Sequence, residues 1–258
     1  MILDMHCHSK EGSPDGIVGI DTTIKILKEK GYDGMLVSDH NSYSGYKSIK
    51  KKQDDFLILR GIEYDSLDAG HLLIILPTRM KYDIFEYKGI IAEDVVKIVH
   101  ALGGIVGPAH PYDYFKLGLC NTKNKDNIEL LRSFDFIETF NACLTKKSYI
   151  LSNALAEELN KPTFGGSDSH HIGTVGLGKT ILPCKIKSED ELIELVKNSN
   201  YNTLSVGGSF VKRKHERLFA AGIVAGGFFY DVFNHCVAFN HTKKANTILD
   251  AINTVLEK

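Results

Sequence analysis

Three side chains near the start of the sequence have the types and the spacing of a metal site. Asp4, His6 and His8 alternate with Met5 and Cys7 in a short apolar segment that is typical of a β-strand. Because successive side chains of a strand point to opposite faces, Asp4, His6 and His8 share one face. Two imidazoles on one side of a strand end supply half of a metal site. The other ligands must then come from later segments.

Other ligand-type side chains follow further predicted strands. Residues 34–38 run straight into Asp39 and His40, and residues 105–109 run into His110. In a parallel α/β sheet or barrel the carboxyl ends of the strands lie at one edge, which is where active sites form. We therefore expect a single cluster. Its candidate metal ligands are His6, His8, Asp15, His40, Glu63, His71, His110, Asp168 and His170.

The segments between these strands have helical periodicity and helix-capping residues. Asp21 is placed to cap a first helix, and Ser188 and Glu191 form a capping box for a later one. Strands that alternate with helices are typical of an α/β fold. The predicted strands cover residues 2–6, 34–38, 56–59, 72–76, 105–109, 134–140 and 181–186, and the predicted helices cover residues 21–30, 90–102, 145–159 and 188–198.

One connection departs from regular strand–helix alternation. Residues 64–70 join the segment that ends at Glu63 to the strand that His71 begins. A helical crossover between parallel strands needs about a dozen residues or more, so this connection is too short for one. We predict a hairpin with Asp68-Ala69-Gly70 in its turn. The hairpin would bring Glu63 and His71 side by side.

The composition limits the class of protein. The 258 residues are 43% hydrophobic, which is enough for one large core. A formal net charge of -1, from 31 basic and 32 acidic residues, argues against a nucleic-acid partner. Five cysteines without a CxxC pair fit reduced thiols in the cytoplasm. No signal peptide is visible, and the longest apolar run, near residues 218–229, is too short to span a membrane.

Nine nitrogen and oxygen donors exceed what one ion takes, since zinc usually takes about four ligands. Each position alone has a structural explanation; Asp39 or Asp168, for example, could simply cap a helix. Their joint occurrence at consecutive strand ends favours a cluster of two or three divalent ions, which could be manganese, iron or zinc. Glu63 is a natural bridge between two of them. Closely spaced ions are suited to holding a phosphate group and activating water.

These motifs together resemble those of the PHP (polymerase and histidinol phosphatase) superfamily. The matching segments are Asp4-x-His6-x-His8, Ser38-Asp39-His40-Asn41, Gly61-Ile62-Glu63, Ala109-His110-Pro111 and Gly166-Ser167-Asp168-Ser169-His170. Residues 139–180 also look like the PHP-associated C-terminal segment. The resemblance covers about the first 185 residues. It implies a distorted (β/α)7 TIM-like barrel, the PHP fold, with a trinuclear metal centre on its carboxyl face.

The resemblance also implies how the ligands divide among the ions. The first ion would take His6, His8, Glu63 and Asp168; the second Glu63, His71 and His110; and the third Asp15, His40 and His170. Two positions have alternatives, because Glu11 competes with Asp15 and His171 could replace His170. The spacing of the motif favours His170.

Our hypothesis is hydrolysis of a small phosphate ester, such as a nucleotide or a sugar phosphate. Hydroxide between the two ions that share Glu63 would attack phosphorus, with Glu63, Asp168 and His170 as the catalytic residues. We expect Asp4 and Asp39 to accept hydrogen bonds from ligand imidazoles, or else from the backbone. The alternatives are a nuclease that acts on nucleic acid ends and a non-catalytic PHP regulatory module. Candidate substrate contacts are Asn141, Lys10, Arg60 and Tyr112.

The last part of the sequence differs from the rest and carries no cluster of ligand-type residues. We assign residues 1–200 to the PHP barrel domain and residues 201–258 to a C-terminal helical extension. The extension contains a basic run, Lys212–Arg217, and an amphipathic segment at 242–256 that is typical of a helix. We expect it either to pack on the barrel or to form a contact between copies in a homo-oligomer.

Overall fold

The structure is a computed structural model that describes residues 1–50, 53–80, 84–113 and 117–211. Its strands are β1 (Ile2–Cys7), β2 (Gly34–Val37), β3 (Leu57–Arg60), β4 (Ile62–Asp65), β5 (His71–Ile75), β6 (Ile105–Pro108), β7 (Ile137–Asn141), β8 (Thr163–Gly166), β9 (Gly178–Ile181) and β10 (Ser205–Gly208). Its helices are α1 (Ile20–Glu29), α2 (Ser44–Lys47), α3 (Ala92–Ala101), α4 (Ile128–Ser133), α5 (Lys146–Glu158) and α6 (Glu189–Lys197), with short 3-10 turns η1 (Ile84–Glu86) and η3 (Leu119–Asn121).

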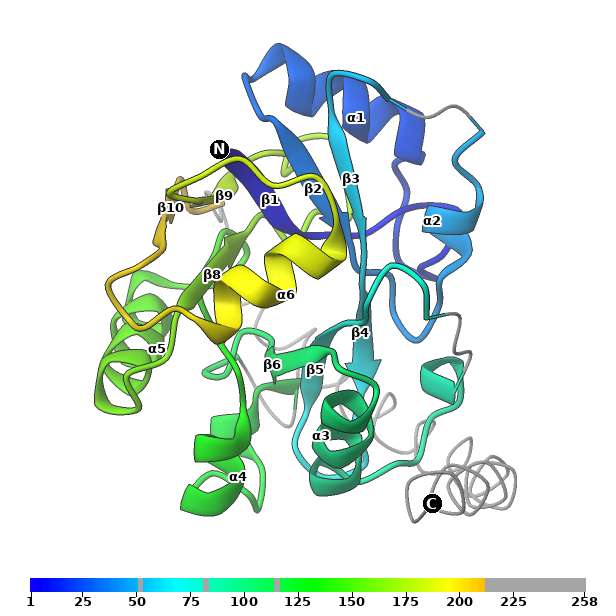
Figure 1. Cartoon of the computed structure of the whole chain (residues 1–258). Helices are drawn as coiled ribbons and strands as arrows, with labels where there is room; N and C mark the ends of the chain where they lie inside the picture. The colour runs from blue at the N-terminus through cyan, green and yellow to red at the C-terminus, as the bar shows by residue number, and fades with distance from the viewer. Residues whose placement is uncertain (51–52, 81–83, 114–116, 212–258) are drawn as a thin grey trace, which may run out of the picture.

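The described strands form three sheets in a mixed α/β fold (Figure 1). The sheet orders are β10-β9-β1-β2-β3, β4-β5-β6 and β7-β8. The expected α/β class is therefore confirmed, but the strands do not join into one closed barrel. The hairpin β4-β5 and the antiparallel additions β9 and β10 interrupt the regular parallel winding that a closed ring requires.

Backbone hydrogen bonds nevertheless connect the sheets where the candidate ligands lie. The Asp168 amide donates to the His6 carbonyl at 2.8 Å and so joins the end of β8 to β1. The Asn41 amide donates to the Glu63 carbonyl at 2.9 Å and joins the end of β2 to β4. The three sheets thus bring their ligand-bearing ends to one place.

The predicted hairpin is confirmed. β4 and β5 pair antiparallel, with Asp65 opposite His71. The Ser66 amide donates to the Gly70 carbonyl at 3.0 Å, and Gly70 has a positive φ of 71°, which glycine adopts without steric cost. The sharp turn returns the chain directly, so Glu63 and His71 lie on neighbouring strands.

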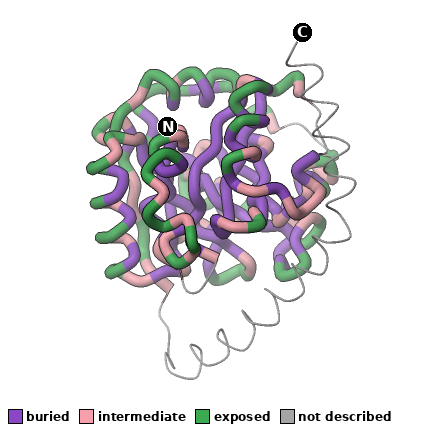
Figure 2. The backbone as a smooth tube through the Cα atoms, turned by 90° about the horizontal axis from the view of Figure 1, so that it is seen from below, coloured by how far each residue is buried: buried purple, intermediate pink, exposed green. Residues whose placement is uncertain are grey.

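The core is built from the buried faces of these strands and helices. Met5 and Cys7 on β1 are fully buried, which an inner strand of an α/β fold requires. Ile24 and Leu27 of α1 pack with Met35 of β2 in one buried cluster. Figure 2 shows buried segments through the middle of the molecule and exposed segments around them. The strands that carry the ligands are therefore held rigidly from both sides.

The starts of two helices differ from their predicted capping. Ser188 is the N-cap of α6 and accepts from the Glu191 amide at 3.3 Å, but the Glu191 carboxylate accepts from the Lys187 amide, one residue before the cap. Asp21 is not the cap of α1, since α1 already begins at Ile20. The Ile20 amide donates instead to Glu11 at 3.1 Å, a carboxylate from the preceding loop.

The strand predicted over residues 181–186 lies earlier in the chain, as β9, and runs antiparallel to β1. The Thr180 hydroxyl, which hydrogen-bonds the backbone of Gly165, helps to fix β9 beside β8. β10, at residues 205–208, pairs with β9 and so belongs to the five-stranded sheet. The basic run Lys212–Arg217 and the predicted terminal helix lie outside the described residues. Within the described part, no helix is long and apolar enough to cross a membrane.

Candidate metal centre

Glu63 lies at the centre of the candidate ligands. It comes from β4, and its side chain is only 1% exposed. One carboxylate oxygen, Oε2, lies 3.1–3.3 Å from three imidazole nitrogens, which are Nε2 of His6, Nε2 of His8 and Nδ1 of His40. The other oxygen, Oε1, lies 2.9 Å from His71 Nδ1 and 2.8 Å from His110 Nε2. The two oxygens of one carboxylate therefore face two separate groups of imidazoles, as a bridging ligand must.

Asp168 completes the first group of donors. Its Oδ1 lies 3.1 Å from His8 Nε2 and 3.6 Å from His6 Nε2, and these two nitrogens are 3.1 Å apart. Both histidines project from the carboxyl end of β1 toward Glu63, as strand alternation predicts. Four donor atoms within such distances can surround one ion.

The third group of donors lies at the more open edge of the cluster. Asp15 Oδ2 is 3.1 Å from His170 Nε2 and 3.5 Å from His40 Nε2. The competing residue Glu11 is used to hold the start of α1, and His171 is exposed. The side chain of Asp15 is 51% exposed, whereas Glu63 is buried. The three groups thus run from a buried interior to an accessible edge.

Two buried acids in this cluster were missed by the sequence analysis as site residues. Glu138 on β7 accepts from the His110 amide at 2.6 Å, and its Oε1 lies 2.9 Å from His6 Nδ1. Asp65 on β4 has its Oδ1 3.3 Å from His71 Nε2. The signal for Asp65 was present, because it follows Glu63 by two residues and so shares its face of the strand. The signal for Glu138 was an acid flanked by apolar residues such as Phe136 and Ile137 in a predicted strand.

Asp4 and Asp39 do not contact ligand imidazoles, so that part of the prediction is wrong. Asp4 Oδ1 accepts from the Ser167 amide at 2.8 Å, and Asp39 accepts from the Ser9 amide at 2.6 Å and the Ser9 hydroxyl at 2.8 Å. The alternative of backbone capping is confirmed for both. Each carboxylate instead anchors a loop that carries metal-ligand candidates.

The backbone is held in a rare conformation at two ligand positions. His110 has a φ of 28° and Asp168 a φ of 50°, both in the left-handed region that non-glycine residues seldom adopt. Hydrogen bonds at their amides, to Glu138 and to the His6 carbonyl, hold them there. Strain of this kind persists where the surroundings fix it and is common at functional sites. It aims both side chains at the cluster.

The four candidate substrate contacts lie in different surroundings. Asn141 is buried, and its amide donates to Asp168 Oδ2 at 3.1 Å, so it supports a ligand. Lys10 is exposed in the loop that carries Asp15. Arg60 donates to the Pro77 carbonyl at 2.9 Å, away from the cluster. Tyr112 is partly buried against the apolar core cluster around β5 and α3. Of these, the structure places only Asn141 against a candidate metal ligand.

Charges in the cluster stabilise one another. Burial opposes protonation of His6, but Glu138, Asp168 and Glu63 outweigh it and raise the pKa of His6 well above its usual value. Burial likewise opposes ionisation of Glu63, but His40, His71 and His6 lower its pKa well below the usual range. In the same way Glu63 and Asp113 raise the pKa of His110 to about 9 despite its burial. Ions that bind here would displace protons from these imidazoles.

Buried polar atoms without hydrogen bonds fit a site for metal ions. Glu63 Oε2 is one of them: three imidazole nitrogens lie 3.1–3.3 Å away, but none makes a hydrogen bond with it. Buried polar atoms normally have partners, so such atoms need an explanation. Five overlapping groups of three or four donor atoms occur here within coordinating reach. Imidazole nitrogens with carboxylate oxygens suit divalent manganese, iron or zinc.

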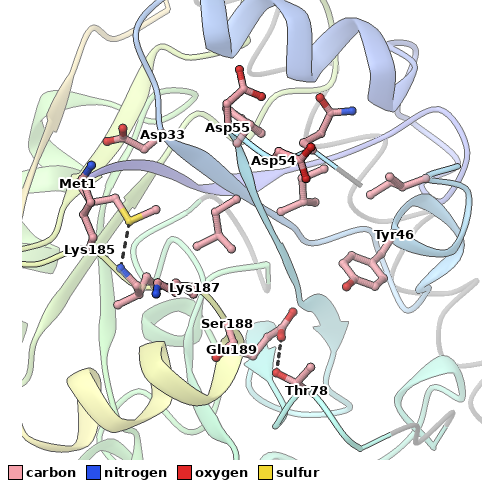
Figure 3. A pocket seen from close by; sticks show the side chains of 16 residues that line it. Met1, Asp33, Tyr46, Asp54, Asp55, Thr78, Lys185, Lys187, Ser188 and Glu189 are labelled. Carbon is pink, nitrogen blue, oxygen red and sulfur yellow. Dashed lines mark hydrogen bonds between the residues drawn. The ribbon is translucent and has the colours of Figure 1, made fainter. Parts of the chain in front are cut away.

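A hollow of about 820 Å³ elsewhere in the molecule does not contain these residues. It lies near the amino ends of the first strands, where Met1, Asp33 and Leu57 line it (Figure 3). At its edge Glu189, at the start of α6, accepts from the Thr78 hydroxyl at 2.7 Å. None of the nine candidate ligands lines this hollow. The candidate metal ligands lie at the opposite, carboxyl ends of the strands.

Comparison with known proteins finds PHP-like matches. The PHP-associated family model matches residues 151–201. An archaeal relative, an uncharacterised protein of Methanocaldococcus jannaschii, is 24% identical over 153 residues, which are 55% of this chain and 82% of the relative. A two-domain protein of Bacteroides vulgatus, described as containing a predicted PHP-like metal-dependent phosphoesterase, matches with a TM-score of 0.56 and 17% identity over 81% of this chain and 65% of that chain. These matches support a PHP-like fold, with a PHP-associated segment at residues 151–201.

Two endonuclease structures share the fold of this chain. Endonuclease Q, in complex with a 27-mer duplex, matches with a TM-score of 0.53 and 16% identity over 76% of this chain and 57% of that chain. A lesion-specific endonuclease from Pyrococcus furiosus matches with a TM-score of 0.56 and 17% identity over 76% and 56% of the two chains. This chain thus spans little more than half of these enzymes. Their similarity does not support our expectation, based on net charge, against a nucleic-acid partner.

Proposed function

We propose that this PHP protein is a metal-dependent hydrolase that cleaves phosphate esters of a small molecule. The observation that carries the proposal is the position of Glu63, whose two oxygens each face a different group of imidazoles. We assign two to three divalent ions to the three groups of donors around it. Such ions would neutralise phosphate oxygens and lower the pKa of water.

The protein's own residues would orient these donors and limit access to them. Glu138 holds Nδ1 of His6, which leaves Nε2 directed at Glu63 and His8. Asn141 donates to one oxygen of Asp168 and leaves the other beside His8. The buried end of the cluster excludes water, whereas the exposed Asp15 marks the side from which an ester can approach. Glu63, Asp168 and His170 are accordingly our candidate catalytic residues.

Cleavage of nucleic acid is the second candidate. The observation that favours it is the likeness of fold to Endonuclease Q, whose structure holds a duplex with an abasic lesion at the active site. The same donor groups would serve either substrate, since both are phosphate esters. The two proposals therefore differ in the surface around the cluster.

The test is hydrolysis by purified, manganese-loaded protein of a panel of nucleotides, sugar phosphates and other small phosphate esters, beside single- and double-stranded oligonucleotides. We expect small esters to be hydrolysed, and His8→Ala and Asp168→Ala to abolish the activity. His171→Ala is the matched control, because His171 is an exposed neighbour of the ligand candidates. Activity on oligonucleotides alone would favour the nuclease. Undiminished activity in both ligand variants would overturn the metal-centre proposal.

A further inference from the structure

Asp65 occupies an unusual place beside the candidate metal centre. It follows Glu63 by two residues on β4, and it is 5% exposed. Its Oδ1 lies 3.3 Å from His71 Nε2 and 3.5 Å from His40 Nδ1. These two histidines come from different elements and belong to different donor groups. One carboxylate oxygen thus contacts an imidazole of the second group and an imidazole of the third.

A lysine compensates the charge of this carboxylate. Lys88 Nζ lies 2.5 Å from Asp65 Oδ2, and the Lys88 side chain is only 18% exposed. The pair leaves Oδ1 directed at the histidines while Oδ2 is held by the ammonium group. Buried carboxylates are stable when they are paired and hydrogen-bonded in this manner. Asp65 is therefore fixed in position before any ion binds.

The contacts of Asp65 distinguish the two nitrogens of each ring. Nδ1 of His71 is the atom beside Glu63 Oε1, so Nε2 is the atom that faces Asp65. Nε2 of His40 is the atom beside Asp15, so Nδ1 faces Asp65 as well as Glu63. Neither contact has the geometry of a hydrogen bond here, but an ionised carboxylate so close to a ring attracts an N–H group, so it favours the tautomer with a proton on the nitrogen that faces it. The opposite nitrogen then carries the lone pair that a metal needs.

We propose that Asp65 is a positioning residue shared by the second and third donor groups. It would set the tautomers of His71 and His40, so that Nδ1 of the first and Nε2 of the second are available to ions. The inference depends on the metal centre of the proposed function but not on the identity of the substrate. It would add to the nine candidate ligands a carboxylate that acts through two of their histidines and couples the occupancy of two positions.

The test is zinc titration of the apoprotein, followed by calorimetry and elemental analysis, with Asp65→Ala and the isosteric Asp65→Asn. We expect Asp65→Ala to retain one ion at wild-type affinity, on the His6, His8 and Asp168 group, which Asp65 does not touch. The affinity for the other ions should fall about 10- to 100-fold, the usual effect of losing a carboxylate that orients a ligand histidine. Asp65→Asn keeps the shape of the side chain and should show the same order of effects if the alanine variant does not fold.

A second readout separates positioning from a general structural role. Nitrogen NMR of labelled histidines in the zinc-loaded protein reports which ring nitrogen carries the proton. We expect a tautomer change at His71 and His40 in the Asp65 variants. Asp135→Asn is the matched control. Asp135 lies 2.9 Å from His100 Nε2, in a pair that is not part of the cluster, so its substitution should change neither result.

The outcomes are distinct. Wild-type affinity for every ion and unchanged tautomers in both Asp65 variants would overturn the inference, even if the variants melt at a lower temperature. Wild-type protein that binds its ions as expected but hydrolyses no phosphate ester would overturn the proposed function and leave the inference on Asp65 intact.

Discussion

The Nδ1 atom of His6 lies 2.9 Å from Oε1 of Glu138, on a strand more than 130 residues later in the sequence. This contact turns the imidazole so that Nε2 faces His8 and Glu63. The other oxygen of Glu138 accepts from the His110 amide and so helps to hold that residue in its left-handed conformation. One carboxylate on β7 therefore orients two ligand candidates, one through its ring and the other through its backbone.

Replacing Glu138 with glutamine should weaken metal binding without removing a ligand. The amide keeps the size of the side chain but loses the charge that favours a proton on His6 Nδ1. We expect the affinity of the first ion to fall about 10- to 100-fold, as is usual when a partner of a ligand histidine is changed. Calorimetric metal titration would measure this. Affinity equal to that of the wild type would show that Glu138 acts only on the fold.

Glu63→Gln should have a larger effect on metal content. The two oxygens of Glu63 face separate groups of imidazoles, and the substitution removes its charge while it leaves its volume. We expect elemental analysis to show a loss of at least one ion per chain relative to the wild type, and no detectable hydrolysis of any ester that the wild type cleaves. Circular dichroism should remain unchanged. Full metal content in the variant would exclude Glu63 as a bridge.

The sequence predicted which donor side chains lie together, because their positions follow from local rules. Alternation along β1 places His6 and His8 on one face, and the short connection after Glu63 requires a hairpin. Contacts between segments far apart in the chain were not accessible in this way. Asp4 contacts the Ser167 amide and Asp39 contacts Ser9, and no local pattern distinguishes these partners from an imidazole.

The limit of local rules also applies to a supporting acid, Glu138, and to the way the strands join into sheets. Glu138 lies in a strand whose inward side depends on register, which neighbouring strands determine, whereas Asp65 could have been found because it shares a strand face with Glu63. The insertion of an antiparallel hairpin and the addition of β9 and β10 beside β1 depend on tertiary pairing rather than on periodicity. The order of elements is therefore compatible with a closed ring of parallel strands, although the described strands form three separate sheets.

Bound metal should stabilise the folded protein. The donors are assembled only in the folded state, so an ion at 100 times its dissociation constant adds about 2.7 kcal/mol to the free energy of unfolding. For a chain of this size that corresponds to a rise in melting temperature of roughly 5–10 °C. Differential scanning calorimetry of apoprotein with and without manganese would measure it. Asp168→Ala should show a smaller rise and His171→Ala the full one; an equal rise in both would indicate that the ion binds elsewhere.

Gly166→Ala should disrupt the first donor group through its backbone. A Cβ atom at position 166 would lie 2.3 Å from His6 Cβ and 2.6 Å from the His6 amide nitrogen, far closer than atoms can approach. β8 or β1 must therefore shift, and the shift moves His6 away from Glu63 and Asp168. We expect metal affinity to fall at least tenfold and the melting temperature to decrease. Gly207→Ala is the matched control, because Gly207 also lies in a strand of this part of the fold but has no atom within 4 Å of the added Cβ. If the two variants bind metal equally well, the close packing of β8 against β1 does not position His6.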